Sequence, residues 1–301
     1  MTNHPSLAGI FPPVATPFTD SGAVDLDGLQ FNLQRLNQEP LAGYVLGGSN
    51  GEFSSLTIAE RLEVVRAARA VTAPGRLLIA GTGLETTRGT SDLTERMAAL
   101  GADVAIVVTP GYFRAKMTPA ALEAHYRAVA DAAPIPILLY SVPANTGVDL
   151  PAASVARLAG HPNILGLKDS GGDITKIGQM VYECGPDFQV LAGSAGFLLA
   201  TLAVGGVGGV MALANIAARP LFELYTRFQA GDLAGARAGQ QPLIDANSAV
   251  TARFGVAGLK AAMDLLGYRG GRPRLPLLPL GDDERAALRA SLERAGLLPA
   301  A

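Results

Sequence analysis

One of the four lysines lies where a lysine could act as a nucleophile. Lys168 directly follows the apolar run Ile164–Leu167. The other three are Lys116 in a loop, Lys176 in the first turns of an expected helix, and Lys260 in a later helical stretch. Burial disfavours the ammonium form, and a neutral amine can attack a ketone to form an imine. The alternative is a lysine at a strand end that extends its side chain to solvent.

Tyr140 is a candidate proton carrier because it closes the apolar run Ile135–Tyr140. A phenol ordinarily ionises near pH 10, so a catalytic tyrosine needs a hydrogen-bond chain to act as a base at neutral pH. Ser49, Asn50 and Tyr112 are the candidates for that chain. The alternative is a core tyrosine whose hydroxyl simply has a partner.

The glycine-rich segment Gly47–Glu52 (GGSNGE) is a candidate carboxylate-binding turn. Successive backbone N–H groups in such a turn can hold an anion, here assisted by Ser49 and Asn50. Glu52 could act as a base or could bond to nearby backbone. The segment also matches the Gly-x-Ser-x-Gly string of serine hydrolases, but no histidine follows an expected strand, so we interpret the match as accidental.

Metal and nucleotide cofactors are not expected. The three histidines, His4, His125 and His161, are scattered and make no ligand pattern, which argues against a zinc site or a metal-dependent aldolase. Gly81-Thr-Gly83 follows an apolar run, but Thr86 occupies the third glycine position of a dinucleotide fingerprint. The sequence therefore predicts chemistry by side chains alone.

The elements that must position these residues are eight short apolar runs. They are continuously apolar, as strands covered on both faces should be, and span Gly9–Val14, Tyr44–Leu46, Leu77–Ala80, Val104–Val108, Ile135–Tyr140, Ile164–Leu167, Gln189–Ala192 and Val207–Ala212. Helical patterns lie between them, with start signals at Thr57 and Glu60 and at Thr118 and Pro119, and a stop at Gly101. Eightfold alternation predicts a (β/α)₈ TIM barrel, with a doubly wound sheet as the alternative.

The pattern changes near residue 219. Helical stretches follow one another over residues 220–267, a proline-rich loop covers 270–280, and a last helix is expected near 283–296. We predict a catalytic barrel over residues 1–219 and a C-terminal helical extension over 220–301, packed on the barrel. In a barrel of this kind, the C-terminal ends of the strands carry the active site, so Lys168, Tyr140 and the turn should meet there.

Composition excludes several partners. A hydrophobic content of 49% supports a large core, and a net charge of −2 gives no electrostatic case for nucleic acid or an anionic membrane. The uncharged stretch from Phe188 to Ala218 is long enough to span a bilayer, but its glycines favour a buried strand, helix and strand. With Cys184 as the single cysteine and no leader pattern over Met1–Pro13, we expect a cytoplasmic protein.

Several motifs resemble the dihydrodipicolinate synthase/N-acetylneuraminate lyase family in order and spacing. They are GSNGEF, VVTPGYF, LLYSVPANTGVDLP, GLKDSGGD, VLAGSAGF and FGVAGLKAAMDLLGY, and they cover essentially the whole chain. Within the family, GSNGEF, YSVPANTG, KDSGGD and LAGSAGF most resemble the aldolases that act on 4-hydroxy-2-oxoglutarate.

The resemblance implies a role for each matching residue. Lys168 would form the imine with the keto acid and Tyr140 would shuttle protons. Ser49 and Asn50 would bind the pyruvoyl carboxylate, and Ser49 would relay protons. Tyr112 would reach a neighbouring subunit's site. Ser170, the Gly193 backbone and Asn145 would contact substrate.

The resemblance also implies a homotetramer, a dimer of dimers, that takes the keto acids pyruvate and glyoxylate and needs no cofactor. An arginine that follows the YNVP motif of the synthases is absent, because Ala144 and Asn145 follow YSVP here, and Asn50 replaces a threonine. These departures favour cleavage of 4-hydroxy-2-oxoglutarate to pyruvate and glyoxylate. Two alternatives stay open: a synthase or another pyruvate aldolase of the family, and a non-catalytic barrel that binds keto acids.

Overall fold

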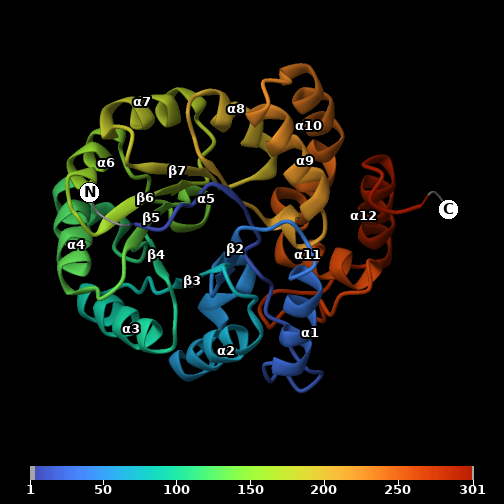
Figure 1. Cartoon of the computed structure of the whole chain (residues 1–301). Coiled ribbons are helices and arrows are strands. Elements are labelled where there is room, and N and C mark those ends of the chain that lie inside the picture. The colour runs from blue at the N-terminus through green and yellow to red at the C-terminus, as the bar shows by residue number, and fades with distance from the viewer. Residues whose placement is uncertain (1–3, 300–301) are drawn as a thin grey trace.

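In the computed structural model, which describes residues 4–299, eight parallel strands form a barrel (Figure 1). The strands are β1 (Gly9–Phe11), β2 (Gly43–Leu46), β3 (Leu77–Gly81), β4 (Val104–Val108), β5 (Ile137–Ser141), β6 (Ile164–Asp169), β7 (Gln189–Ala192) and β8 (Gly208–Val210). They pair in the order β1-β8-β7-β6-β5-β4-β3-β2. The Val14 N–H donates to the Val45 carbonyl (2.9 Å), which joins the chain after β1 to β2. The predicted TIM barrel is confirmed, and the doubly wound alternative is wrong.

Helices lie between and after the strands in the chain, and most of them surround the strands on the outside (Figure 1). They are α1 (Leu26–Leu36), α2 (Ile58–Val71), α3 (Thr87–Ala99), α4 (Pro119–Ala132), α5 (Pro143–Thr146), α6 (Ala152–Ala159), α7 (Ile174–Cys184), α8 (Leu198–Ala203), α9 (Ala218–Gln229), α10 (Leu233–Ser248), α11 (Gly255–Leu265) and α12 (Asp282–Arg294). The helix α9 follows β8 and packs against β1. The predicted C-terminal helices are present, and the division at residue 219 stays a prediction.

The helix starts follow from local chemistry. Thr57 and Glu60 form the expected capping box of α2, in which each side chain accepts the other residue's backbone N–H. Thr118 caps α4 with Pro119 at its first turn. After α3 the chain reverses at Gly101, whose φ of 89° suits glycine.

The uncharged stretch 188–218 forms β7, α8 and β8 with short turns between them, and its side chains are mostly buried. Among the described residues, no helix is long and apolar enough to cross a membrane. The expectation of a buried strand, helix and strand is therefore confirmed.

Two strands differ from their predicted bounds because proline has no N–H to donate to a ladder. The strand β1 ends at Phe11, three residues before the expected end, because Pro12 and Pro13 follow. Likewise β5 begins at Ile137, directly after Pro136. The strand β8 also ends earlier than predicted: it stops at Val210, and the chain then enters a 3₁₀ turn.

Apolar side chains fill the barrel interior as one cluster and the strand–helix layers as two others. The interior cluster includes Phe11, Val45, Ile106, Leu138 and Tyr140. Side chains along a strand alternate between faces, so Leu138 and Tyr140 point inward while Leu139 packs against the helices. Tyr140 is therefore the last inward-facing residue of β5, at the end of the barrel that carries the active site in this fold.

Candidate active site

Lys168 and Tyr140 lie side by side on neighbouring strands. They are register partners in the β5–β6 pair, and both are buried, with 4% and 5% of their surfaces exposed. The Lys168 Nζ atom lies 4.1 Å from the centroid of the Tyr140 ring. Compared with the predicted runs, β5 continues one residue further, to Ser141, and β6 two residues further, to Asp169, and these two residues pair. The amine and the phenol thus share one enclosed space at the mouth of the barrel.

The surroundings of Tyr140 favour proton transfer. Burial alone would raise the pKa of the Tyr140 phenol, but the charge of Lys168 and the hydroxyls of Ser49 and Ser170 outweigh burial and hold it below its ordinary value. The Ser49 Oγ atom lies 3.5 Å from the Tyr140 hydroxyl. Of the three residues predicted to make a chain to Tyr140, Ser49 is the one in hydrogen-bond contact.

The turn Gly47–Glu52 presents Ser49 to this pair. Gly47 has a φ of 64°, after which Ser49–Gly51 form one turn of 3₁₀ helix. The Gly51 carbonyl accepts a hydrogen bond from the Thr16 hydroxyl (2.8 Å), which anchors the turn to the chain that follows β1. The first N–H groups of a helical turn have no acceptor within the turn, so the amides of Ser49 and Asn50 are available to an anion.

Two adjoining hollows open over the strand ends. The inner hollow is apolar and rich in glycine, and is lined by Val45, Gly47, Gly48, Phe53, Gly81, Gly83, Ile106, Val108, Tyr140 and Lys168. The outer hollow is lined by Ser49, Glu52, Phe53, Ser54, Ser55, Glu85, Val108, Gly111, Tyr112, Val142, Asn145, Thr146, Gly255, Val256 and Leu277. Phe53 and Val108 border both, so the two hollows are neighbours. Lys168 and Tyr140 lie on the inner one.

The remaining predicted residues fall in different places. Asn145 lies on α5 and lines the outer hollow, whereas Asn50 is not among the lining residues of either hollow. Tyr112 also borders the outer hollow, but 79% of its surface is exposed. Its backbone N–H donates to the Glu85 carboxylate (2.9 Å), which anchors the loop. Tyr112 thus belongs to the rim of the site in a single chain.

Gly193 and Ser170 approach each other closely. The Gly193 N–H donates to the Asp169 carbonyl (2.6 Å). A Cβ atom at position 193 would lie 2.0 Å from the Ser170 Oγ atom and 2.5 Å from the Asp169 carbonyl oxygen. Only glycine fits this approach, so the chain after β7 is held against the chain after β6.

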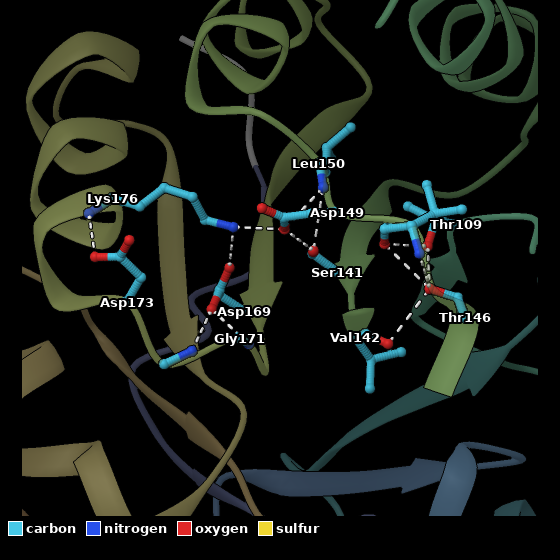
Figure 2. A network of polar contacts seen from close by, with 12 residues as sticks. Thr109, Ser141, Val142, Thr146, Asp149, Leu150, Asp169, Gly171, Asp173 and Lys176 are labelled. Carbon is cyan, nitrogen blue, oxygen red and sulfur yellow. Dashed lines mark hydrogen bonds and ion pairs between the residues drawn. The ribbon is translucent and has the colours of Figure 1, made fainter. Parts of the chain in front are cut away.

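A network outside the barrel supports the same strand ends (Figure 2). Ser141 and Asp169 point away from the interior, opposite to Tyr140 and Lys168. Lys176 on α7 bridges Asp169 Oδ2 (3.1 Å) and Asp149 Oδ1 (2.6 Å), and the Ser141 hydroxyl donates to Asp149 (2.9 Å).

The other Asp169 oxygen accepts the N–H groups of Gly171 and Gly172, at 2.8 and 3.0 Å. These bonds shape the loop that carries Ser170. Sequence reasoning missed the network, although a carboxylate followed by paired glycines in KDSGGD is a signal for such a turn.

Ser49 and His125, which the sequence offered for other chemistry, have partners of their own. Ser49 contacts Tyr140 instead of a histidine, so the hydrolase string has no catalytic partner. The His125 ring bonds to the Thr87 hydroxyl (2.9 Å) on the helical layer. Within residues 4–299, no group of three or more histidine, cysteine, aspartate or glutamate side chains could hold a metal ion.

Comparisons with known proteins match nearly the whole chain. The model of the dihydrodipicolinate synthetase family matches residues 6–295. A 4-hydroxy-tetrahydrodipicolinate synthase from Exiguobacterium is 37% identical, over 96% of this chain and 98% of the relative. A probable mitochondrial 4-hydroxy-2-oxoglutarate aldolase from Emericella nidulans is 34% identical, over 96% of this chain and 95% of the relative.

A solved dihydrodipicolinate synthase from Acinetobacter baumannii, complexed with pyruvate, superposes with a TM-score of 0.91 at 31% identity, over 97% of this chain and all of that one. The match spans nearly the whole sequence and the same barrel. The relatives described above are named as a synthase and a probable aldolase. The chain therefore belongs to the dihydrodipicolinate synthetase family and is an aldolase or lyase of that family.

Proposed function

We propose that the protein is a class I aldolase that cleaves 4-hydroxy-2-oxoglutarate to pyruvate and glyoxylate through an imine on Lys168. The observation that carries the proposal is the buried pair of Lys168 and Tyr140, with Ser49 bonded to the phenol. A class I aldolase needs one amine and one proton carrier within reach of the same substrate atom. The Acinetobacter relative binds pyruvate, which supports a keto acid at this position.

The steps use only side chains of this chain. The neutral amine of Lys168 attacks the C2 ketone and water leaves, which gives a protonated imine. The imine withdraws electrons from the C3–C4 bond. Tyr140, relayed by Ser49, takes the proton of the C4 hydroxyl as that bond breaks and glyoxylate departs. The enamine is protonated at C3, and hydrolysis of the imine releases pyruvate and regenerates Lys168.

The substrate's pyruvoyl carboxylate would lie on the amides of Ser49 and Asn50, and the Ser170 hydroxyl and Gly193 backbone would also contact the substrate. The second carboxylate would lie in the outer hollow near Asn145. No arginine or lysine is among the described residues that line this hollow. Neutral donors can hold the small carboxylate of glyoxylate, whereas the synthases that the sequence resembles carry an arginine two residues after their YNVP motif, where Asn145 stands here. This feature favours the aldolase over the synthase.

Two rivals differ in what they predict. Several relatives are named 4-hydroxy-tetrahydrodipicolinate synthase, which keeps that activity as the second candidate. A non-catalytic barrel that only binds keto acids would use Lys168 as a cation. The Lys168 charge would lower the Tyr140 pKa in that barrel too, so turnover is what separates it from the aldolase.

The assembly and compartment are part of the proposal. We infer a cytoplasmic homotetramer, a dimer of dimers, in which the exposed Tyr112 side chain meets a neighbouring subunit's site. The proposed chemistry requires no metal or organic cofactor. The net charge of −2 gives no case for a nucleic-acid partner.

A pair of assays separates the candidates. Pyruvate release from 4-hydroxy-2-oxoglutarate is measured beside condensation of pyruvate with aspartate semialdehyde. We expect cleavage without condensation. Condensation without cleavage would replace the aldolase with the synthase, and neither activity would favour the binding barrel.

A further inference from the structure

A buried ion pair connects the active-site turn to the C-terminal helices. Glu52, which ends the turn Gly47–Glu52, is 2% exposed, and Lys260 on α11 is fully buried. The Lys260 Nζ atom lies 2.5 Å from Glu52 Oε1. The other carboxylate oxygen, Oε2, accepts the backbone N–H of Arg274 (2.9 Å). Both oxygens of Glu52 are thus held by residues beyond position 219, which leaves it no role as a base.

Further contacts surround the ion pair of Glu52 and Lys260. Lys260 also donates to the Arg272 carbonyl (3.1 Å), and its Nζ atom lies 4.2 Å from the centroid of the Phe18 ring. The Arg274 guanidinium lies 4.3 Å from the same centroid.

The Arg274 guanidinium also pairs with Glu60 at 2.5 Å and donates to the Ser55 carbonyl (2.8 Å). The segment 272–274 therefore contacts the chain at Glu52 and again at Ser55, on both sides of Phe53. None of these contacts involves a residue of a barrel strand.

The backbone dihedral angle of Glu52 indicates that these contacts impose a left-handed backbone conformation. Among the described residues, Glu52 is the one non-glycine with a positive φ, at 53°. A side chain that carries a Cβ adopts this left-handed conformation at a cost and keeps it where its surroundings fix it. The conformation redirects the chain directly after Ser49–Gly51, the turn that carries the Ser49 hydroxyl.

A buried ion pair is a costly way to obtain stability alone. Apolar residues of similar volume often stabilise a protein as well or better, because the two charges must lose their water. Here, however, the two carboxylate oxygens have different partners, the Lys260 ammonium at Oε1 and the Arg274 N–H at Oε2, and together these partners fix the direction of the Glu52 side chain. Such a pair therefore suits a place where direction matters.

We propose that Glu52 and Lys260 are positioning residues, whose ion pair fixes the turn Gly47–Glu52 from the C-terminal helices and so holds the Ser49 hydroxyl against Tyr140. The kinetic part of this inference rests on the proposed function, because it assumes that Ser49 relays protons to Tyr140. The structural part stands without it. The C-terminal helices would then complete the active site and do more than cover the barrel.

The test uses the full chain and the double variant Glu52→Gln/Lys260→Met, which removes both buried charges at similar volume. We expect backbone amides of residues 47–56 to exchange hydrogen faster than in the wild type, while amides of β4 stay protected. We also expect kcat for cleavage to fall by on the order of 10²-fold, since small misplacements of catalytic groups have effects of this size. The rising limb of the pH–rate profile should move to higher pH, because Tyr140 loses the Ser49 hydrogen bond.

Leu288→Ala is the matched control. Leu288 on α12 is fully buried and is not among the residues that grip the turn, so its truncation lowers stability through a cavity. We expect the control to unfold more easily yet keep the wild-type pH–rate profile and the wild-type exchange of residues 47–56. If the double variant does not fold, Glu52→Asp keeps the charge, withdraws the carboxylate by one methylene, and should show the same shifts at smaller size.

The positioning role would be overturned if the folded double variant exchanged the amide hydrogens of residues 47–56 at the wild-type rate and kept the rising limb of the pH–rate profile at its wild-type pH. A wild-type enzyme that releases no pyruvate would instead contradict the proposed function. In that case the exchange of residues 47–56 still decides whether the ion pair holds the turn.

Discussion

The chemistry of the site begins with the register of two residues. Tyr140 and Lys168 are partners across β5 and β6, so the parallel ladder places the phenol beside the amine. The Ser49 hydroxyl then reaches the phenol from a turn about ninety positions earlier in the chain. The lowered pKa of Tyr140 follows from these neighbours, since burial by itself would raise it.

The first prediction concerns proton transfer by Tyr140. Tyr140→Phe should lower kcat for cleavage by about 10²–10⁴-fold, the usual range for loss of a general base. Ser49→Ala should keep the phenol but raise its pKa, because a hydrogen bond to the ionised form is lost. The rising limb of the pH–rate profile should therefore move to higher pH. An unchanged limb in Ser49→Ala would show that Tyr140 is not the titrating base.

At the scale of elements, β5 and β6 each contribute to the site with side chains on both of their faces. The inward residues are Tyr140 and Lys168, and the next outward ones, Ser141 and Asp169, join the network of Lys176 (Figure 2). Asp169 is fully buried, so removal of the Lys176 ammonium leaves the charge of its carboxylate unpaired in the strand–helix layer, with hydrogen bonds to Oδ1 alone.

Lys176→Met should lower the free energy of unfolding by about 3 kcal/mol, the cost of breaking a buried ion pair by removing one partner. Burial opposes the charge of Lys176, but the carboxylates of Asp149 and Asp169 outweigh burial and raise its pKa above 10.5. The stabilisation should therefore be complete below pH 10.5 and be lost as the pH rises through the raised pKa. Urea unfolding at neutral and strongly alkaline pH measures both effects. A difference between variant and wild type that is the same at both pH values would contradict the assignment.

A second prediction at this scale concerns acid. The Arg274 hydrogen bonds lower the pKa of Glu60 from 4.5 to about 2, although burial opposes the shift. A lowered pKa means that the stabilisation is present above pH 4.5 and is lost as the pH falls toward 2. Glu60→Gln should therefore be less stable than the wild type at pH 7 and approach it near pH 2.

Glu63→Gln, an exposed change on the same helix, serves as the control. It should follow the wild-type stability curve at every pH. A Glu60→Gln curve parallel to that of the wild type would exclude the ion pair with Arg274 as the source.

The sequence predicted the elements well because its signals are local. Continuous apolar runs, the Thr57–Glu60 capping box and Pro119 at the start of α4 depend on neighbours along the chain. The proximity of Lys168 and Tyr140 could be predicted because a barrel brings the C-terminal ends of its strands to one face. The Lys176 and Lys260 partners could not be found, because each ion pair joins segments that only the tertiary fold brings together.

At the scale of the whole molecule, the site draws on both ends of the chain. The barrel supplies Lys168, Tyr140 and Ser49, whereas α11 and the segment 272–274 hold Glu52 at the end of the turn. The exposed aromatic side chain of Tyr112 lies at the rim, where the proposed neighbouring subunit would meet it. An active barrel cut at residue 219 would contradict this dependence.

The central claim is that Lys168 forms an imine with the keto acid. The measurement that tests it most directly is borohydride reduction in the presence of pyruvate, followed by peptide mapping of the modified lysine. The account predicts one pyruvate-derived group on Lys168 in the wild type and none in folded Lys168→Ala. A wild type that traps no pyruvate, or a Lys168→Ala protein that still does, would contradict it.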